Sequence, residues 1–432
     1  MAVPSAAMRG WRVAGVLLAS SAAWSASVAA GAGKVQPAAG KRLKAYPTRY
    51  YVIHTDLGPD VAREAAARMT AMAEEYHRRT RDFAGAIRRR LPFYLFGRAK
   101  DYHDAGGPAG TAGIYDPGSQ RLMALADGGA DENLWHTVRH EGFHQFAHRV
   151  IGGRLPTWID EGLAEYFGHG VWTGDGFVTG VIPPYRLKRL QGHIRGGRLR
   201  PFLEMITLTH REWGDALHPA GEKSQAPRGG APAPGPDREN GASQQRPTRA
   251  RVHYDQAWSM VHFLVHADDG RYRQALSALI RDVSRGADAK LSFRRRLGRN
   301  VKAFEKRCAD WWLARKPDDT ADLYIQAVVA TMTSYLARGV AQGQTFPSAE
   351  AFFREARSGT LKAHKTQWLP PSLLNEALLH ARAWRTGWSL DHAGKAPRVV
   401  LSWPTGKVFT GTFSHARGTC SGVKVTVTTK KP

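Results

Sequence analysis

The segment "HEGFHQF", residues 140–146, is the feature that most constrains how this chain can fold. A helix turns about 100° per residue, so His140 and His144 lie about 40° apart on one face, and Glu141 is turned about 100° from His140. Two imidazole nitrogens on one face can hold one metal ion, and the carboxylate can lie beside that ion without binding it. The alternative interpretation is three polar residues that share a helix surface by chance.

Start and stop signals define two helices around this segment. Asp131 can cap the first helix, which we predict for residues 131–150 and which a pair of glycines ends. Pro156 suits the first turn of a second helix, which ends at Gly168. The sequence therefore predicts two helices that reverse direction across "IGGRLP".

The second helix carries Glu161 in the segment "WIDEGLAEYF". Because the chain reverses, this carboxylate can return to the two histidines as a third metal ligand and leave the fourth position for water. Such a set is typical of a catalytic zinc site, in which Glu141 would take the proton of the water. Asp160 and Glu165 are the alternative third ligands. Glu165 could instead orient a histidine N–H or be an ordinary half-exposed helix glutamate.

Four histidines follow one another at a spacing of four, at positions 136, 140, 144 and 148. Only His140 is followed directly by a glutamate, which selects the pair His140 and His144 as ligands. We therefore expect His136 and His148 to lie around the ligands or at the surface.

Residues upstream of the paired helices predict a sheet. The segments "RYYVIHTDL" (49–57) and "LPFYLFGRAKDYHDA" predict strands, and residues 59–83 between them predict a long helix rich in Ala, Glu and Arg. Two short apolar runs flank D-P-G-S within residues 112–127, which indicates a hairpin. Together these elements predict a small antiparallel sheet with helices, and an α+β fold.

Composition divides the rest of the chain. Pro, Gly, Ala and polar residues dominate positions 218–251, which predicts a disordered insertion. Apolar residues then recur at helical spacing to about residue 390, and alternating Val and Thr with Gly breaks indicate β structure at 397–429. The predicted organisation is a signal peptide (1–32), a sheet with the paired helices (45–217), the insertion (218–251), a helical part (252–395) and a β-rich tail (396–432).

Residues 1–32 have the features of an export signal. Arg9 and Arg12 precede the run "VAGVLLASSAAWSASVAA", and small residues at 30–32 offer a cleavage site. No cysteine directly follows the run, which argues against a lipoprotein anchor, and no later stretch reaches the 18 or more apolar residues of a spanning helix. We therefore expect a periplasmic, cell-surface or extracellular protein without a transmembrane helix in its mature form. The alternative is an uncleaved N-terminal anchor.

The formal net charge of +25 predicts attraction to anionic surfaces or polymers. The arginines are spread along the chain, and no nucleic-acid-binding motif contains them. A generally basic surface with non-specific anionic partners is expected, without a specific nucleic-acid partner.

Two cysteines, Cys308 and Cys420, exclude an all-cysteine zinc site and a disulfide-dense scaffold. In an oxidising compartment they could pair, or they could remain two separate buried thiols.

The motif H-E-x-x-H followed by "WIDEGLAEYF" resembles the gluzincin metallopeptidases of the peptidase MA clan. The pieces "YYVIHTDLGPDVAREAAARM", "AGIYDP" and "RHEGFHQFAHR" further resemble the DUF1570 family of bacterial proteins, over roughly residues 48–270. The resemblance implies a thermolysin-like α+β fold with an active-site helix pair, a mostly helical C-terminal region and a short terminal β segment. By position, it implies that His140, His144 and Glu161 bind Zn²⁺ and that Glu141 is the general base.

Tyr254, in "VHYDQAWSMVHFL", resembles the tyrosine that hydrogen-bonds the oxyanion in aminopeptidase-like gluzincins. A phenol near the metal would stabilise the charge that develops in the transition state. The alternatives are that Tyr254 is a core aromatic residue, and that His253 is the donor.

The G-x-M-E-N signature, which binds a free substrate N-terminus in aminopeptidases, is missing, and "AGIYDP" stands where an edge strand would run. An extended peptide could add to that strand by backbone pairing. We therefore expect an exported zinc metallopeptidase, acting as an endopeptidase on a peptide or protein substrate. The alternatives are a non-catalytic zinc-containing module that binds anionic cell-surface or wall polymers, and a polyanion-binding protein for which zinc is incidental.

Overall fold

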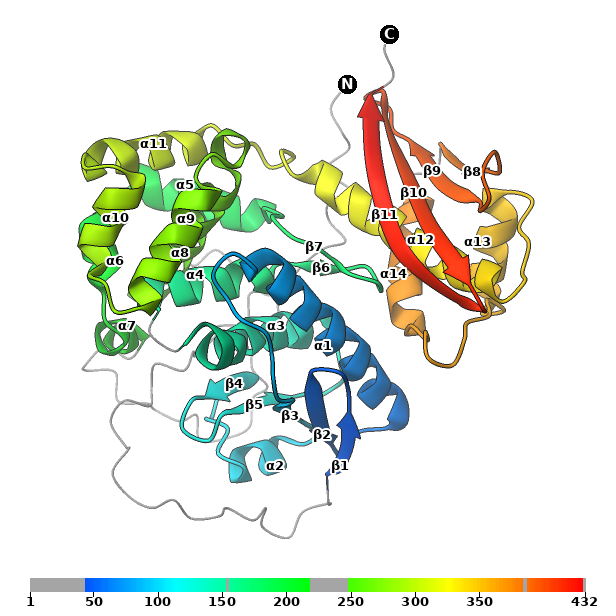
Figure 1. Cartoon of the computed structure of the whole chain (residues 1–432), viewed down its shortest axis with the longest axis horizontal. Coiled ribbons are helices and arrows are strands. Elements are labelled where there is room, and N and C mark those ends of the chain that lie inside the picture. Colours follow the sequence, from blue (N-terminus) through cyan, green and yellow to red (C-terminus); the bar gives the residue numbers. More distant parts are fainter. Residues whose placement is uncertain (1–42, 153–154, 218–247, 384–386, 430–432) are drawn as a thin grey trace, which may run out of the picture.

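The computed structural model describes residues 43–152, 155–217, 248–383 and 387–429. The predicted signal peptide, and residues 218–247 of the predicted insertion, lie outside the described residues. The fold is α+β, as predicted (Figure 1).

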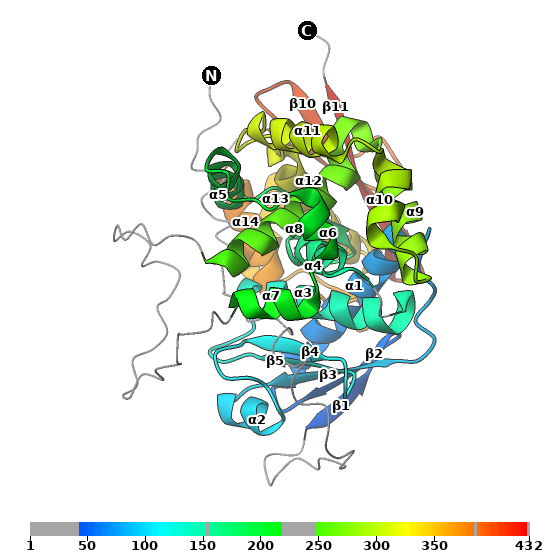
Figure 2. The ribbon, with the colours of Figure 1, turned by 90° about the vertical axis from the view of Figure 1, so that its left-hand side faces the viewer.

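A five-stranded sheet forms the N-terminal part, with the strand order β1-β2-β3-β5-β4. Its strands are β1 (Lys44–Pro47), β2 (Tyr51–Thr55), β3 (Leu91–Phe96), β4 (Gly113–Asp116) and β5 (Arg121–Leu125). Figures 1 and 2 both place α1 (Pro59–Thr80) and α3 (Glu132–Phe146) on one face of this sheet and α2 (Ala99–Asp104) beyond the other. Since β4 lies at the end of the order, the strand predicted from "AGIYDP" is an edge strand.

The prediction of an antiparallel sheet was wrong, because this sheet is mixed. The hairpin of β4 and β5 is antiparallel, as predicted, and so is the pair of β1 and β2. However, β3 runs parallel to both β2 and β5. The physical reason is that α1 carries the chain back between β2 and β3, and a crossover of this length returns the next strand in the parallel direction.

Two packed helices follow the sheet and agree with the predicted pair. The Asp131 side chain caps α3 by accepting a hydrogen bond from the Leu134 N–H. A π-helical turn, η3 (Ala147–Ile151), extends α3 and ends at Gly152, whose φ is +115°. The second helix, α4 (Thr157–Gly168), packs against α3 and against α8 (Arg249–His266).

Gly162 permits the close approach of α4 and α8. A Cβ at this position would lie 2.6 Å from the Ala257 carbonyl oxygen and 2.6 Å from Val261 Cγ2. Backbone cannot move aside as a flexible side chain can, so only glycine fits here.

Gly162→Ala should therefore lower the free energy of unfolding, by about 1 to 3 kcal/mol, because overpacking outweighs the better helix propensity of alanine. Gly192→Ala is the matched control, since its Cβ would meet only Arg198 Nη2, at 3.6 Å. The control should be neutral or more stable by up to about 1 kcal/mol. Chemical denaturation measures both variants, and equal stability of the two would contradict the close approach.

A helical region surrounds α4 and α8. Its elements are the short hairpin β6 (Val171–Trp172) and β7 (Phe177–Val178), the helices α5 (Pro184–Arg195), α6 (Phe202–Thr207), α7 (His210–Leu217), α9 (Arg273–Ser284), α10 (Ala289–Leu297) and α11 (Val301–Leu313), and the 3₁₀ turn η5 (Ala267–Gly270). The Thr248 side chain caps α8, so residues 249–251 belong to this helix and not to the insertion predicted for 218–251.

The C-terminal part is a four-stranded antiparallel sheet packed on helices (Figure 1). Its elements are α12 (Ala321–Ala341), α13 (Ala349–Ser358), α14 (Pro371–Ala383), β8 (Trp388–Asp391), β9 (Arg398–Ser402), β10 (Lys407–Ala416) and β11 (Thr419–Thr429). The predicted β-rich tail is confirmed, and its first strand begins at Trp388, before the predicted boundary at 396. Arg338 of α12 forms two hydrogen bonds with Asp175, which ties this part to the turn between β6 and β7.

Cys308 and Cys420 are both buried and unpaired, so they remain two separate thiols. Among the described residues, every helix is too short or too polar to cross a membrane.

Candidate metal centre

Three side chains from α3 and α4 converge where these helices pack. His140 and His144 project from α3, and Glu161 projects from the second turn of α4. All three are buried. The Nε2 atoms of the histidines lie 3.1 Å apart, and Glu161 Oε2 lies 3.4 Å from each of them.

This triangle of donor atoms has the dimensions of a metal site. A tetrahedral zinc ion with bonds of about 2.0 to 2.1 Å separates its ligand atoms by about 3.3 to 3.4 Å. Glu161 Oε2 is buried and pairs with the two histidine nitrogens at 3.4 Å, without a hydrogen bond of good geometry among the described residues. A cation at the centre of the triangle would satisfy this oxygen and both nitrogens together. The donor set therefore fits a metal ion.

The opposite nitrogens of both histidines face carboxylates. Asp160 Oδ2 lies 3.1 Å from His144 Nδ1, and Glu165 Oε1 lies 3.6 Å from His140 Nδ1. Contacts of this kind turn the Nε2 atoms toward a metal. Asp160 and Glu165, the alternative third ligands, thus lie behind the histidines, whereas Glu161 lies in front of them.

Charges in the centre depend on one another. Burial alone would raise the pKa of Glu161, but His144 and His140 lower it to about 2. Burial alone would lower the pKa of His144, but Asp160 and Glu161 raise it well above its ordinary value. The ionised form of Glu161 is therefore favoured beside the two histidines.

Glu141 lies beside the triangle and outside it. Its Oε2 accepts a hydrogen bond of 2.8 Å from the Tyr115 N–H of β4, and its Oε1 is buried without a hydrogen-bond partner among the described residues. Burial raises the pKa of Glu141, which the neighbouring histidines only partly offset. One oxygen is fixed and the other is available to accept a proton.

Tyr254 and His253, neighbours on α8, face different surroundings. The Tyr254 ring lies 6.3 Å from that of His140 and 5.1 Å from that of Trp213. Burial, and then Glu161, raises the pKa of Tyr254 well above its ordinary value, so the phenol keeps its proton. His253 Nε2 accepts a hydrogen bond of 2.9 Å from Arg200, and burial lowers its pKa to about 4. Tyr254 therefore lies beside a ligand, whereas His253 is engaged by Arg200.

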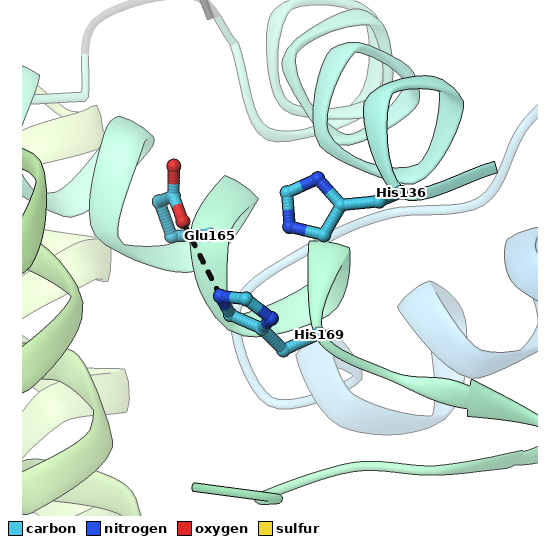
Figure 3. A group of neighbouring side chains, drawn as sticks. All are labelled: His136, Glu165 and His169. Carbon is cyan, nitrogen blue, oxygen red and sulfur yellow. Dashed lines mark ion pairs between the residues drawn. The ribbon is translucent and has the colours of Figure 1, made fainter. Parts of the chain in front are cut away.

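The two remaining histidines of the repeat lie around the centre, as expected. His148 Nδ1 lies 2.8 Å from the hydroxyl of Tyr115, so it anchors the residue that holds Glu141. His136 belongs to a second buried group, with Glu165 and His169 (Figure 3).

His169, and the neighbouring Arg186, were not predicted from the sequence as site residues. The i, i+4 spacing of Glu165 and His169 on α4 was an available signal. Arg186 lies on α5 and donates a hydrogen bond to Glu165, 21 positions away, and no spacing rule connects the two.

Neither a protein-family model nor a curated protein sequence matches this chain. Its function is therefore inferred from the chemistry of its own residues.

Proposed function

We propose that the protein is an exported zinc-dependent metallopeptidase of the gluzincin type, similar to the DUF1570 proteins, and that it acts as an endopeptidase. His140, His144 and Glu161 are the zinc ligands, and Glu141 is the general base. The observation that supports this most is the triangle of donor atoms, with edges of 3.1, 3.4 and 3.4 Å, beside a buried carboxylate that is not part of it.

Bound zinc would polarise the scissile carbonyl and lower the pKa of a water molecule. Glu141 accepts the proton of the attacking water at Oε1 and passes it to the nitrogen of the leaving amine. Its raised pKa suits both steps, because the carboxyl can hold the proton between them. The Tyr115 N–H keeps the other oxygen of Glu141 in place throughout.

The edge strand β4 supports a peptide as the substrate. A strand at the end of a sheet can pair with an extended chain through its backbone, whatever the side chains of that chain. Because Glu141 is bonded to this same strand, a peptide added there would run beside the general base.

Tyr254 is the proposed oxyanion donor, and Tyr254→Phe should lower kcat by about 10²–10³-fold, because a single donor of this kind contributes that much. Zinc content should not change, since the phenol is not a ligand. Tyr185→Phe, at a tyrosine that is 37% exposed on α5, is the control. A kcat within twofold of wild type for Tyr254→Phe would contradict the oxyanion role and favour a structural role for this residue beside Trp213.

The test of the proposed function is proteolysis of an unfolded protein such as casein by the purified protein. Cleavage should stop when a chelator removes the metal, return when zinc is restored, and be absent in Glu141→Gln.

The net charge of +25 favours a second candidate, a zinc-containing module that binds anionic cell-surface or wall polymers without catalysis. Exposed basic residues gather on α10, where Lys290, Arg294 and Arg295 face solvent. For this candidate, salt-dependent retention on an anionic matrix should be strong, and wild type and Glu141→Gln should be equally inert toward varied substrates.

A further inference from the structure

The second buried group, His136, Glu165 and His169, has the composition of another metal site (Figure 3). Its candidate ligand atoms all lie within 4.8 Å of one another. Glu165 Oε2 and His169 Nε2, joined by the dashed line in Figure 3, are 3.7 Å apart.

A guanidinium already lies against two of the three residues of this group, Glu165 and His169. Arg186 Nη1 donates a hydrogen bond to Glu165 Oε2 and also lies within hydrogen-bond distance of His169 Nε2. Arg186 is 3% exposed and its guanidinium lies 4.5 Å from the centre of the Trp258 ring, so it is packed in place. A divalent cation among the same atoms would contact this positive charge in a buried environment, where repulsion is strong.

The protonation of the histidines agrees with a resident cation. Burial, and then the neighbouring arginines, lower the pKa values of His136 and His169 well below the ordinary value. Burial beside these arginines therefore favours the neutral form of both imidazoles.

Arg186 joins the elements on which the metal centre depends. Glu165, which Arg186 holds by one oxygen, directs its other oxygen toward His140 Nδ1. On α8, Arg186 Nη2 donates a hydrogen bond of 3.2 Å to the Tyr254 carbonyl, and its Nε lies 3.0 Å from Asp255 Oδ1. The Arg186 side chain from α5 thus holds two other helices. It holds α4 through Glu165, the carboxylate behind the ligand His140, and it holds the segment of α8 that carries Tyr254.

We propose that Arg186 is a positioning residue: it occupies the second group as a built-in cation, excludes a second metal ion, and holds Glu165 and α8 in register around the first. This inference rests on the proposed zinc site. It implies that each chain binds one zinc ion, and that the zinc affinity depends on Arg186 although Arg186 is not a ligand.

Arg186→Lys and Arg186→Gln test the inference in the full-length protein. Lysine keeps the charge but cannot reach Glu165, His169, Asp255 and the Tyr254 carbonyl from one planar group. Zinc affinity is measured by competition with a chromophoric chelator. It should be about tenfold weaker for Arg186→Lys than for wild type, and weaker still for Arg186→Gln. Loss of a residue that orients a metal ligand typically weakens metal binding by about 10 to 100-fold. Kinetics should show a fall in kcat with KM little changed.

Arg189→Lys is the matched control. Arg189 also binds Asp255, through two hydrogen bonds, but among the described residues it forms no hydrogen bond or ion pair with Glu165, which it influences only through longer-range electrostatics. The zinc affinity of Arg189→Lys should stay within about twofold of wild type. If Arg186 had only a structural role, the Arg186 variants would have a lower Tm, but once folded they would bind zinc as wild type does. This result would overturn the inference.

Stoichiometry separates the remaining outcomes. Two zinc ions in wild type, with one lost in His169→Ala, would overturn the inference and leave the proposed function standing. A wild type that binds no zinc would overturn the proposed function and this inference with it. One zinc ion in wild type and in His169→Ala supports the inference.

Discussion

Replacing Glu141 by Gln should abolish peptide hydrolysis and leave zinc bound. The loss expected for a general acid–base residue is about 10²–10⁴-fold in kcat. An amide cannot accept the proton of the attacking water or deliver it to the leaving amine, and Glu141 is outside the triangle of ligand atoms.

The variant should fold like wild type. Glu141 Oε2 accepts a hydrogen bond from the Tyr115 N–H, and an amide oxygen can accept the same bond. Glu141 is buried with a raised pKa, so removing its charge relieves a desolvation cost. A loss of activity can therefore be assigned to chemistry once the zinc content and the circular dichroism spectrum match those of wild type.

Glu350→Gln is the matched control for this experiment. Glu350 is an exposed glutamate in the first turn of α13, and its removal should leave kcat within about twofold of wild type. If Glu141→Gln retained the activity of this control, the general-base role would be wrong.

His144→Ala and Glu161→Ala should each remove zinc from the purified protein. Losing a residue behind a ligand weakens metal binding by about 10 to 100-fold, and losing a ligand itself should weaken zinc binding by more than that. Each change leaves two of three protein donor atoms, and the Glu161 variant also removes the only carboxylate of the triangle.

Metal analysis by mass spectrometry measures the effect directly. His415→Ala, at an exposed histidine of β10, is the control and should retain one zinc ion per chain. Asp160→Asn is a graded comparison, because Asp160 contacts His144 from behind, and it should weaken zinc binding by about 10 to 100-fold without abolishing it. If Glu161→Ala retained zinc and Asp160→Asn lost it completely, Asp160 would be the ligand and Glu161 the residue behind a histidine.

Much of the secondary structure was predictable because its signals are local. The Asp131 cap, the stop at Gly152 and the hairpin around D-P-G-S depend on neighbouring residues alone, and the structure confirms them. The direction of β3 was predicted wrongly, because strand direction depends on the path of α1 across the sheet and not on the residues of the strand.

The candidate site also has features that local signals predicted and features that depend on packing. Periodicity placed His140 and His144 on one face of a helix, and the short reversing turn brought Glu161 within reach of both. Glu161 was predicted as the third ligand, with Asp160 and Glu165 as alternatives. Which of the three lies at the Nε2 atoms depends on how α4 packs against α3 and α8.

The sequence by itself determined the helix pair, the types of the donor groups and the presence of a carboxylate beside the first histidine, because these depend on spacing along one chain segment. Only the tertiary structure decided that Glu161 completes the triangle, that the Tyr115 N–H holds Glu141, and that Arg186 lies against the second group. Each of these contacts joins residues from different elements, and its geometry is set by how whole helices pack. Close packing at positions such as Gly162 fixes that arrangement, and it cannot be derived from the order of residues along the chain.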